Sequence, residues 1–145
     1  MVRAYPVAMS LPFECKQYSP DHLDGVLRLS AAEGWHTYSD DPLRAHAAFI
    51  APGVTTGVAL GTSQGQPVGV VSVLSDGVIQ AYLVQLVVDV TWRRAGVASA
   101  LLQYAFSLSG AARLDLLTDT AEVFYAARPH RRMLGFRIYP DASQH

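Results

Sequence analysis

The stretch from Leu83 to Leu102 holds residues whose types and order could bind an anion. An apolar, strand-like run leads into a tight corner at residues 93–98 and then into an amphipathic helical segment that opens on small residues. The first backbone N–H groups of a helix lack intrahelical partners and lie at the positive end of the helix dipole, so they bind phosphate oxygens well. Gly96 and Ala98 are small enough to let a phosphate reach this backbone. The corner therefore predicts a phosphate-binding loop.

The spacing of this corner resembles that of a known family. Arg93-x-x-Gly96-x-Ala98, preceded by Leu86-x-Val88, is similar to the Gln/Arg-x-x-Gly-x-Gly/Ala loop of the GCN5-related N-acetyltransferases, the GNAT family. In that family the loop binds the pyrophosphate of acetyl-CoA, and the strand before it pairs with the pantetheine arm. The family often has Pro where this chain has Val90. The loop alone is also typical of an ordinary helix start in an α/β protein.

The resemblance implies that acetyl-CoA is the cosubstrate and that no metal is needed. Arg93 and Arg94 add positive charge where the helix dipole disfavours cations, which favours an anion ligand over two solvated arginines. Ser99 offers a hydroxyl just inside the helix, or is a plain surface or packing serine. The residues expected to bind acetyl-CoA are Leu86, Val88, Arg93, Arg94, Ala95, Gly96, Val97, Ala98 and Ser99.

Acetyl transfer to an amine needs hydrogen-bond donors to the thioester oxygen and a proton for the departing thiolate. The resemblance implies direct attack by the amine in a ternary complex, with a backbone N–H near Leu86 or Val87 serving the oxygen. Phe124-Tyr125 resembles the family's Phe-Tyr pair, which makes Tyr125 the expected acid. A tyrosine beside a phenylalanine on an apolar helical face is also typical of core packing.

The chain departs from the family pattern after Tyr125. The family commonly has Phe-Tyr-x-x-Leu-Gly-Phe, whereas here the gap before Leu134-Gly135-Phe136 is longer by about two helical turns. Pro129 favours a helix end in this gap. If Leu134-Gly135-Phe136 fixes the register, Arg131 stands where the tyrosine should be. The basic residues of the gap form either a solvated loop or a clamp for the CoA 3′-phosphate or an acidic substrate. They are Arg128, His130, Arg131 and Arg132.

The acceptor amine is expected beside the first two helices, where family members often form the acceptor pocket. The expected binding residues are Trp35, His36 and Tyr38. His36 could accept a proton near neutral pH, but it also fits an ordinary exposed loop histidine.

No general base stands out from the sequence. Glu33 and His46 lie in or beside the first two helices. Gln80 and Gln85 on the long strand cannot act as bases, although either could order a water. Many amines can lose their proton through water, so a missing base does not exclude catalysis. It does leave the identity of the acceptor amine open.

The rest of the chain predicts the elements that position these residues. Val, Leu and Tyr content and Gly-containing turns predict strands at residues 13–18, 55–62, 67–74, 78–90, 114–117 and 136–139. Cap and breaker residues predict helices after Ser19-Pro20, after Asp41-Pro42, from Val97 to near Gly110, and over 118–127. The second helix is expected to bury Leu43, Ala47 and Ile50, and the buried face of the third helix, from Val97 to near Gly110, is expected to include Leu108. The strand at 114–117 is expected to be central and parallel to the strand before the corner.

The order β-α-α-β-β-β-α-β-α-β is that of the GNAT family, and the resemblance spans residues 13 to 140. It implies an α/β fold with a mixed, mostly antiparallel sheet, a splayed parallel strand pair and flanking helices. Residues 1–145 are expected to form a single acyltransferase domain, without linker or internal repeat.

Composition argues against several other classes of protein. The formal net charge of −1 suggests neither a nucleic-acid nor a membrane partner. The single cysteine, Cys15, cannot form an internal disulfide, which favours a reducing, cytoplasmic location. The first dozen residues lack the apolar run of a secretion signal, and no segment approaches the roughly 20 apolar residues of a membrane span. The sequence does not determine the oligomeric state, and a homodimer is one of the open alternatives.

We therefore expect an acetyl-CoA-dependent N-acetyltransferase that acts on a small-molecule amine or an amino group. The alternative is a non-catalytic protein of the same fold that binds or senses acetyl-CoA, favoured by the lengthened stretch after Tyr125 and the missing base. A generic nucleotide-binding protein is a weaker alternative, because the chain has neither Gly-x-x-x-x-Gly-Lys-Ser/Thr nor Gly-x-Gly-x-x-Gly.

Overall fold

The computed structural model describes residues 12–144. The chain divides into two compact units, one that ends at Asp115 and one that begins at Leu116, and each is described by itself. The prediction that the first dozen residues hold no secretion signal concerns residues that, apart from Pro12, lie outside the described range. The prediction of a single domain stays a prediction.

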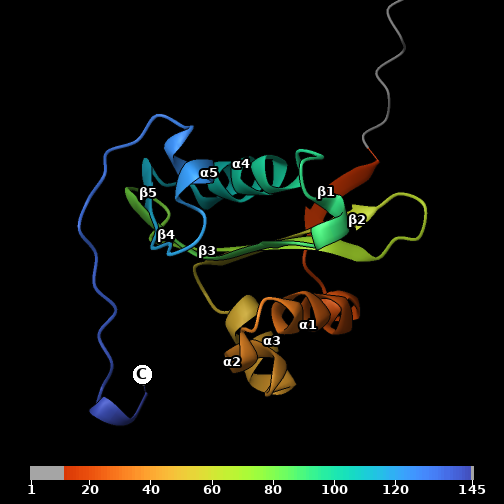
Figure 1. Cartoon of the computed structure of the whole chain (residues 1–145), viewed down its shortest axis with the longest axis horizontal. Coiled ribbons are helices and arrows are strands. Elements are labelled where there is room, and N and C mark those ends of the chain that lie inside the picture. Colours follow the sequence, from red (N-terminus) through yellow and green to blue (C-terminus); the bar gives the residue numbers. More distant parts are fainter. Residues whose placement is uncertain (1–11, 145) are drawn as a thin grey trace, which may run out of the picture. The chain divides into compact units, whose positions relative to one another are not determined.

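The first unit is built on a five-stranded sheet (Figure 1). Its strands lie in chain order and comprise Phe13–Gln17 (β1), Val54–Gly61 (β2), Pro67–Ser75 (β3), Gln80–Val88 (β4) and Arg113–Asp115 (β5). Strands β1 to β4 pair antiparallel, and β5 runs parallel to β4. The predicted mixed, mostly antiparallel sheet with one parallel pair is confirmed.

Strand β5 lies at the edge of this sheet, so the prediction of a central strand at 114–117 is wrong. Central parallel strands are buried on both faces and are almost wholly apolar. Here Arg113 and Asp115 flank Leu114 and are exposed, which suits an edge position.

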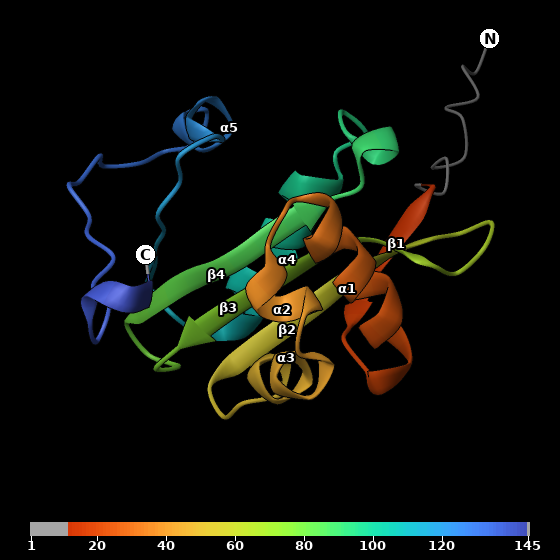
Figure 2. The ribbon, with the colours of Figure 1, turned by 60° about the horizontal axis from the view of Figure 1, so that its bottom comes forward.

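Helices cover both faces of the sheet. On one face lie Leu23–Ala32 (α1), His36–Ser39 (α2) and Pro42–Phe49 (α3), and on the other lies Val97–Ser109 (α4). Figure 1 shows α1 to α3 below the sheet and α4 above it, and Figure 2 turns the first layer toward the viewer. Short 3₁₀ turns at Pro20–His22 and Val90–Trp92 precede α1 and α4. The second unit contains Glu122–Ala126 (α5) and a 3₁₀ turn at Ala142–Gln144.

Helix α3 begins as the sequence predicts but buries a different face. The Asp41 side chain accepts a hydrogen bond from the Arg44 N–H at 3.2 Å, and the helix opens at Pro42. Leu43 and Ile50, however, are 83% and 58% exposed. The buried side is set by Phe49, whose ring stacks on Tyr38 and meets Tyr18 edge-on. The buried face of α3 is therefore determined by the two tyrosine rings opposite Phe49 and not by the number of apolar residues along the helix.

Helix α4 packs directly on glycines of two strands, Gly57 of β2 and Gly69 of β3. A Cβ added to Gly69 would lie 2.8 Å from Leu101 Cδ1 and 3.0 Å from Val97 Cγ1. Val97 and Leu101 are buried, whereas Leu108, predicted to be buried, is exposed. The first turn of α4, directly after the predicted phosphate-binding corner, is therefore fixed against β3.

The final strand predicted at 136–139 is wrong, since the described residues form no strand there. Leu134, Phe136 and Ile138 alternate as in a strand, yet Phe136 and Ile138 are 77% and 89% exposed. A strand needs a neighbour to satisfy its backbone hydrogen bonds. No sheet pairing involves the described part of the second unit, so the local pattern forms no strand.

Replacing Gly69 by valine should destabilise the protein by about 1–3 kcal/mol, the usual cost of overpacking. The added side chain would push Leu101 and Val97 away from the sheet, which outweighs the better strand propensity of valine. Urea unfolding measures the change. Ser63→Val, in the exposed β2–β3 turn, serves as the control and should shift the midpoint little. An unaltered midpoint for Gly69→Val would contradict the close packing of α4.

Candidate functional site

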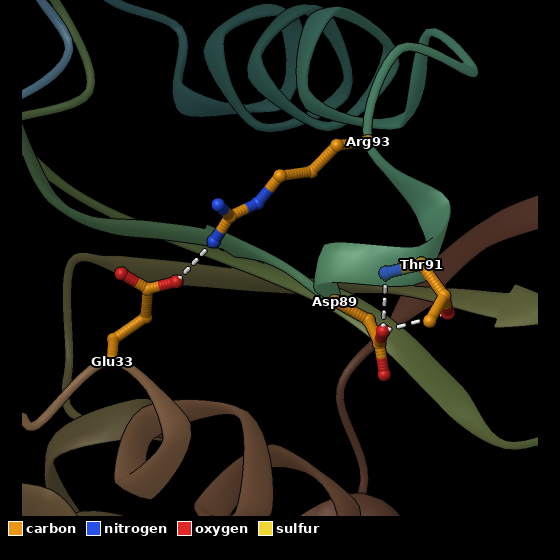
Figure 3. A network of polar contacts seen from close by, with 4 residues as sticks. All are labelled: Glu33, Asp89, Thr91 and Arg93. Carbon is orange, nitrogen blue, oxygen red and sulfur yellow. Dashed lines mark hydrogen bonds and ion pairs between the residues drawn. The ribbon is translucent and has the colours of Figure 1, made fainter.

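The corner between β4 and α4 is held in an unusual backbone conformation. At its start the Asp89 carboxylate accepts hydrogen bonds from the N–H and the Oγ1 of Thr91, both at 2.8 Å (Figure 3). Further on, Arg94 and Gly96 both have left-handed backbones, with φ of +66° and +84°. Glycine adopts this conformation freely, but for arginine it costs roughly 1–2 kcal/mol. Such strain concentrates at functional sites.

The start of α4 fits a phosphate group. Gly96 is its N-cap, and its carbonyl accepts the Ala100 N–H at 3.0 Å, so the N–H groups of Val97 and Ala98 precede the first intrahelical bond. The first turn contains no acidic residue. A Cβ added to Gly96 would meet no atom within 4 Å, so the space over this backbone is open. Val97 is buried as a whole residue, whereas Ala98 is half-buried and Ser99 is exposed.

Strand β5 is short and ends soon after it pairs with β4. The two strands pair only from Gln80 to Tyr82, opposite Arg113 to Asp115. The Gln80 side chain adds two hydrogen bonds between these strands. Its Nε2 donates to Asp115 Oδ2 at 2.9 Å, and its Oε1 accepts from Arg113 Nε at 2.5 Å. From Leu83 onward, the described residues give β4 no partner on that edge.

The open edge of β4 presents the backbone groups of Leu86 and Val88. The Asp89 N–H donates to Val68 O on the β3 side at 2.8 Å. Backbone direction alternates along a strand, so Val87 also faces β3 and its two neighbours face away from it. Leu86 and Val88 are the residues that the sequence predicts to pair with pantetheine, and their orientation fits an amide-bearing chain laid along this edge.

An ion pair links the corner to the α1–α2 segment (Figure 3). Arg93 Nη2 lies 2.5 Å from Glu33 Oε1, and Glu33 is the C-cap of α1. Both side chains are partly exposed. The sequence suggests Glu33 only as a residue near the acceptor, and the structure shows it bound to the predicted phosphate-binding loop.

The Glu33–Arg93 pair lies at an open pocket of about 770 Å³. The pocket is bounded by the end of α1, the β2–β3 turn and the end of β4, and its charged lining is Arg28, Glu33, Asp89 and Arg93. Carboxylates balance guanidinium groups here, so this pocket is not an anion site of its own. It gives solvent and ligands access to the end of β4.

The three predicted acceptor-binding residues lie together at α2 but face different surroundings. Trp35 is the N-cap of α2 and is partly exposed. His36 is exposed, with its Nδ1 3.7 Å from Asp40 Oδ1. The Tyr38 ring is partly buried and stacks on Phe49 at 5.7 Å. Tyr38 thus packs into the helical layer, and the other two remain accessible.

Tyr125 lies on α5, in the second unit, so the structure does not place it against β4. Its ring meets that of Phe124 edge-on at 4.9 Å. Burial raises the pKa of the Tyr125 phenol, and the charge of Arg128 opposes that rise. The phenol therefore keeps its proton throughout the neutral range, as a general acid must.

The basic stretch after Tyr125 makes contacts within its own unit. Arg128 Nη1 donates to the Phe124 carbonyl at 2.7 Å, with its guanidinium 4.0 Å above the Phe124 ring. Arg132 pairs with Glu122 at 2.7 Å. Whether this stretch also binds a phosphate stays a prediction.

Two features of the site escaped the sequence reasoning for different reasons. Asp89, followed two residues later by Thr91, is a local capping pattern that the sequence displays and that could have been recognised. The Glu33–Arg93 pair joins residues that are 60 positions apart, and no local pattern predicts it.

Within residues 12–144, no helix has the length and apolarity needed to cross a bilayer. The same residues contain no group of three or more His, Cys, Asp or Glu side chains placed to hold a metal ion.

The sequence matches the model of the acetyltransferase (GNAT) family over residues 18–136. This chain belongs to the GNAT acetyltransferase family. Comparison with curated proteins found no match. Its fold is shared with solved GNAT structures at low sequence identity, so these structures support the fold alone.

Three solved structures illustrate the likeness. An acetyltransferase from Trypanosoma brucei is 19% identical, with a TM-score of 0.67 and coverage of 87% of this chain and 99% of that chain. A GNAT family protein from Streptococcus pneumoniae TIGR4 is 21% identical, with a TM-score of 0.68 and coverage of 89% and 99%. An aminoglycoside acetyltransferase from an uncultured soil metagenomic sample, in complex with sisomicin, is 16% identical, with a TM-score of 0.70 and coverage of 88% and 95%.

Replacing Glu33 by glutamine should strengthen CoA binding by about threefold to tenfold, the scale of one partly exposed charge pair. The change removes a carboxylate that competes with phosphate for Arg93 and repels it. Calorimetry measures the affinity, and the gain should shrink at high salt because exposed charges are screened. Glu14→Gln, in the exposed β1 pair with Lys16, is the matched control. Weaker binding in Glu33→Gln would instead show that Glu33 holds Arg93 in its binding position.

Proposed function

We propose that this GNAT protein transfers an acetyl group from acetyl-CoA to the amine of a small molecule. The observation that carries the proposal is the continuity between the open edge of β4 and the start of α4. The amide groups of pantetheine would pair with Leu86 and Val88, and the pyrophosphate would lie on the backbone at Gly96. An ordinary helix start explains neither the open edge nor the left-handed Arg94.

The backbone of β4 supplies the donor that the reaction needs. Bound acetyl-CoA brings a thioester whose carbonyl oxygen gains negative charge as the amine attacks, and a fixed N–H donor stabilises that charge. Leu86 and Val87 are the two candidates from the sequence. Only Leu86 faces the open edge, because the neighbouring Val87 faces β3, so we assign this role to the Leu86 N–H.

Tyr125 is the proposed acid for the departing thiolate. Its role rests on the resemblance of Phe124-Tyr125 to the family pair and on the raised pKa of its phenol, which keeps the proton available at neutral pH. Arg131 or solvent is the alternative proton source.

The acceptor is proposed to be a small amine bound near Trp35 and His36, the accessible residues of α2. The aminoglycoside acetyltransferases among the similar structures support this class of acceptor, since one was solved with sisomicin. A cytoplasmic location and the absence of nucleic-acid partners remain part of the proposal. Release of free CoA with a panel of amines separates an enzyme from a protein that only binds acetyl-CoA.

Replacing Gly96 by valine should weaken CoA binding by well over tenfold. The branched side chain would occupy the open space over the helix start and block two hydrogen bonds to the pyrophosphate, each worth about 1.5–3 kcal/mol. Calorimetry on the folded variant measures the loss.

The matched control is Gly77→Val in the β3–β4 turn. Gly77 has φ +80°, close to the +84° of Gly96, and its added Cβ would likewise meet no atom within 4 Å. Both variants therefore carry the same backbone strain, and only the one at Gly96 should lose CoA. Equal CoA affinities would overturn the phosphate-binding assignment.

Replacing Tyr125 by phenylalanine should lower kcat by about 10²–10⁴-fold, the usual contribution of a general acid. Acetyl-CoA affinity should stay unchanged, because the ring is retained. In the parent protein the rate should fall as pH rises through the elevated phenol pKa, since the neutral phenol is the active form. The variant should lack this alkaline decline. A normal kcat at every pH would remove Tyr125 from the mechanism.

A further inference from the structure

A chain of buried hydrogen bonds crosses three strands beneath α3. The Thr56 hydroxyl lies 2.8 Å from the Phe49 carbonyl, which can only accept, so Thr56 donates there. Thr56 must then accept from the Ser72 hydroxyl at 2.9 Å. Ser72 in turn accepts from Gln85 Nε2 at 3.4 Å. The Phe49 carbonyl can only accept, so it fixes the direction of every hydrogen bond in this chain. It thereby also fixes the orientation of the Gln85 amide.

This orientation leaves the carbonyl oxygen of the same amide unsatisfied. Gln85 is only 2% exposed, and its Oε1 is buried without a hydrogen-bond partner among the described residues. Buried polar atoms in native proteins are nearly always paired, because an unpaired acceptor forfeits its hydrogen bonds to water. The amide cannot remove the deficit by flipping, since Ser72 already donates to Thr56.

The unsatisfied oxygen belongs to the residue next to Leu86, whose N–H is the proposed donor to the thioester oxygen. Gln85 directly precedes Leu86, whose backbone faces the open edge of β4. Its side chain lies on the sheet face covered by α1 to α3, the same face as Val87. That face carries α2 with Trp35 and His36, where the acceptor is proposed to bind.

We propose that Gln85 Oε1 accepts a hydrogen bond from an N–H of the acceptor amine. This inference rests on the proposed function and names a substrate-binding residue within it. A primary amine that attacks as the neutral NH₂ can hold one N–H on Gln85 while its lone pair faces the thioester. A secondary amine has one N–H, which it must give up when the amide forms. Gln85 therefore favours primary amines, because a substrate without the spare donor leaves the buried oxygen unpaired.

The test compares Gln85→Met with Gln103→Met. Methionine nearly matches the length of glutamine but has no strong acceptor, and Gln103 is an exposed residue of α4 that receives the same change. The probes are the primary amine that gives the fastest CoA release and its N-methyl derivative. For Gln85→Met, KM for the primary amine should rise about tenfold, and the preference over the N-methyl derivative should shrink equally. CoA affinity should not change, and Gln103→Met should match the parent protein throughout.

Thermal unfolding separates this role from a structural one. If Oε1 is unpaired until substrate binds, Gln85→Met should melt at the parent temperature or higher, because the variant has no buried acceptor to satisfy. An ordered water on Oε1 would instead make the variant melt lower with an unchanged KM, which would overturn the proposal. Gln85→Leu provides a second variant, and failure of both to fold would overturn it as well. If the parent protein releases CoA with no amine, the proposed function fails and this inference with it. If the parent is active and the KM and amine preference of Gln85→Met stay unchanged, this inference alone fails.

Discussion

The short ladder between β4 and β5 is the constraint on which the candidate site depends. The two strands share only the pairing of Gln80–Tyr82 with Arg113–Asp115, and the Gln80 side chain binds both ends of the β5 segment. Beyond it, β4 continues to Val88, and no strand of residues 12–144 pairs with it on that edge. Backbone N–H and C=O groups are obligatory hydrogen-bonding groups, so an open edge that long is satisfied by water or by a ligand with matching amides. A longer β5 would close the same edge and leave no room for a cosubstrate.

The charges at the end of β4 include both cations and carboxylates, so the positive charge of the corner is partly compensated. The helix dipole and two arginines favour phosphate at the corner, but Glu33 takes up one guanidinium and Asp89 holds the turn from the other side. A loop with uncompensated positive charge would bind many anions. The Glu33 carboxylate offsets part of the positive charge that Arg93 brings to the corner. It also joins the corner to the α1–α2 segment, so a ligand that displaces it affects both.

The sequence was most informative where structure is decided locally. The 3₁₀ turn that leads into α1 begins at Ser19-Pro20, and α3 and α4 begin at Asp41-Pro42 and Gly96, because capping and left-handed turns depend on a few adjacent residues. The predictions of the buried face of α3 and of a strand at 136–139 were wrong because both features depend on distant residues. The face of α3 depends on the ring contacts of Phe49 with Tyr18 and Tyr38, and a strand at 136–139 would need a pairing partner. The backbone of the corner is also decided locally, and the left-handed Gly96 and the helix start lie where the spacing predicts them. The Glu33–Arg93 pair and the Thr56–Ser72–Gln85 chain connect distant residues, and no spacing rule reveals them.

The buried hydrogen-bond chain beneath α3 places one unpaired acceptor, Gln85 Oε1, in an otherwise apolar face of the sheet. Val58, Val70 and Val87 make the surrounding face apolar, so a valine or leucine at position 85 would complete the core. The buried Gln85 amide instead has a donor that is satisfied by Ser72 and an acceptor without a partner among the described residues, and such an unpaired acceptor makes burial of the amide costly. Since its orientation is dictated from Phe49 through two hydroxyl groups, the unpaired oxygen is held in one direction rather than left to rotate. An acceptor that has no partner among the described residues contributes little to folding, and its fixed direction fits the proposed hydrogen bond from a substrate amine.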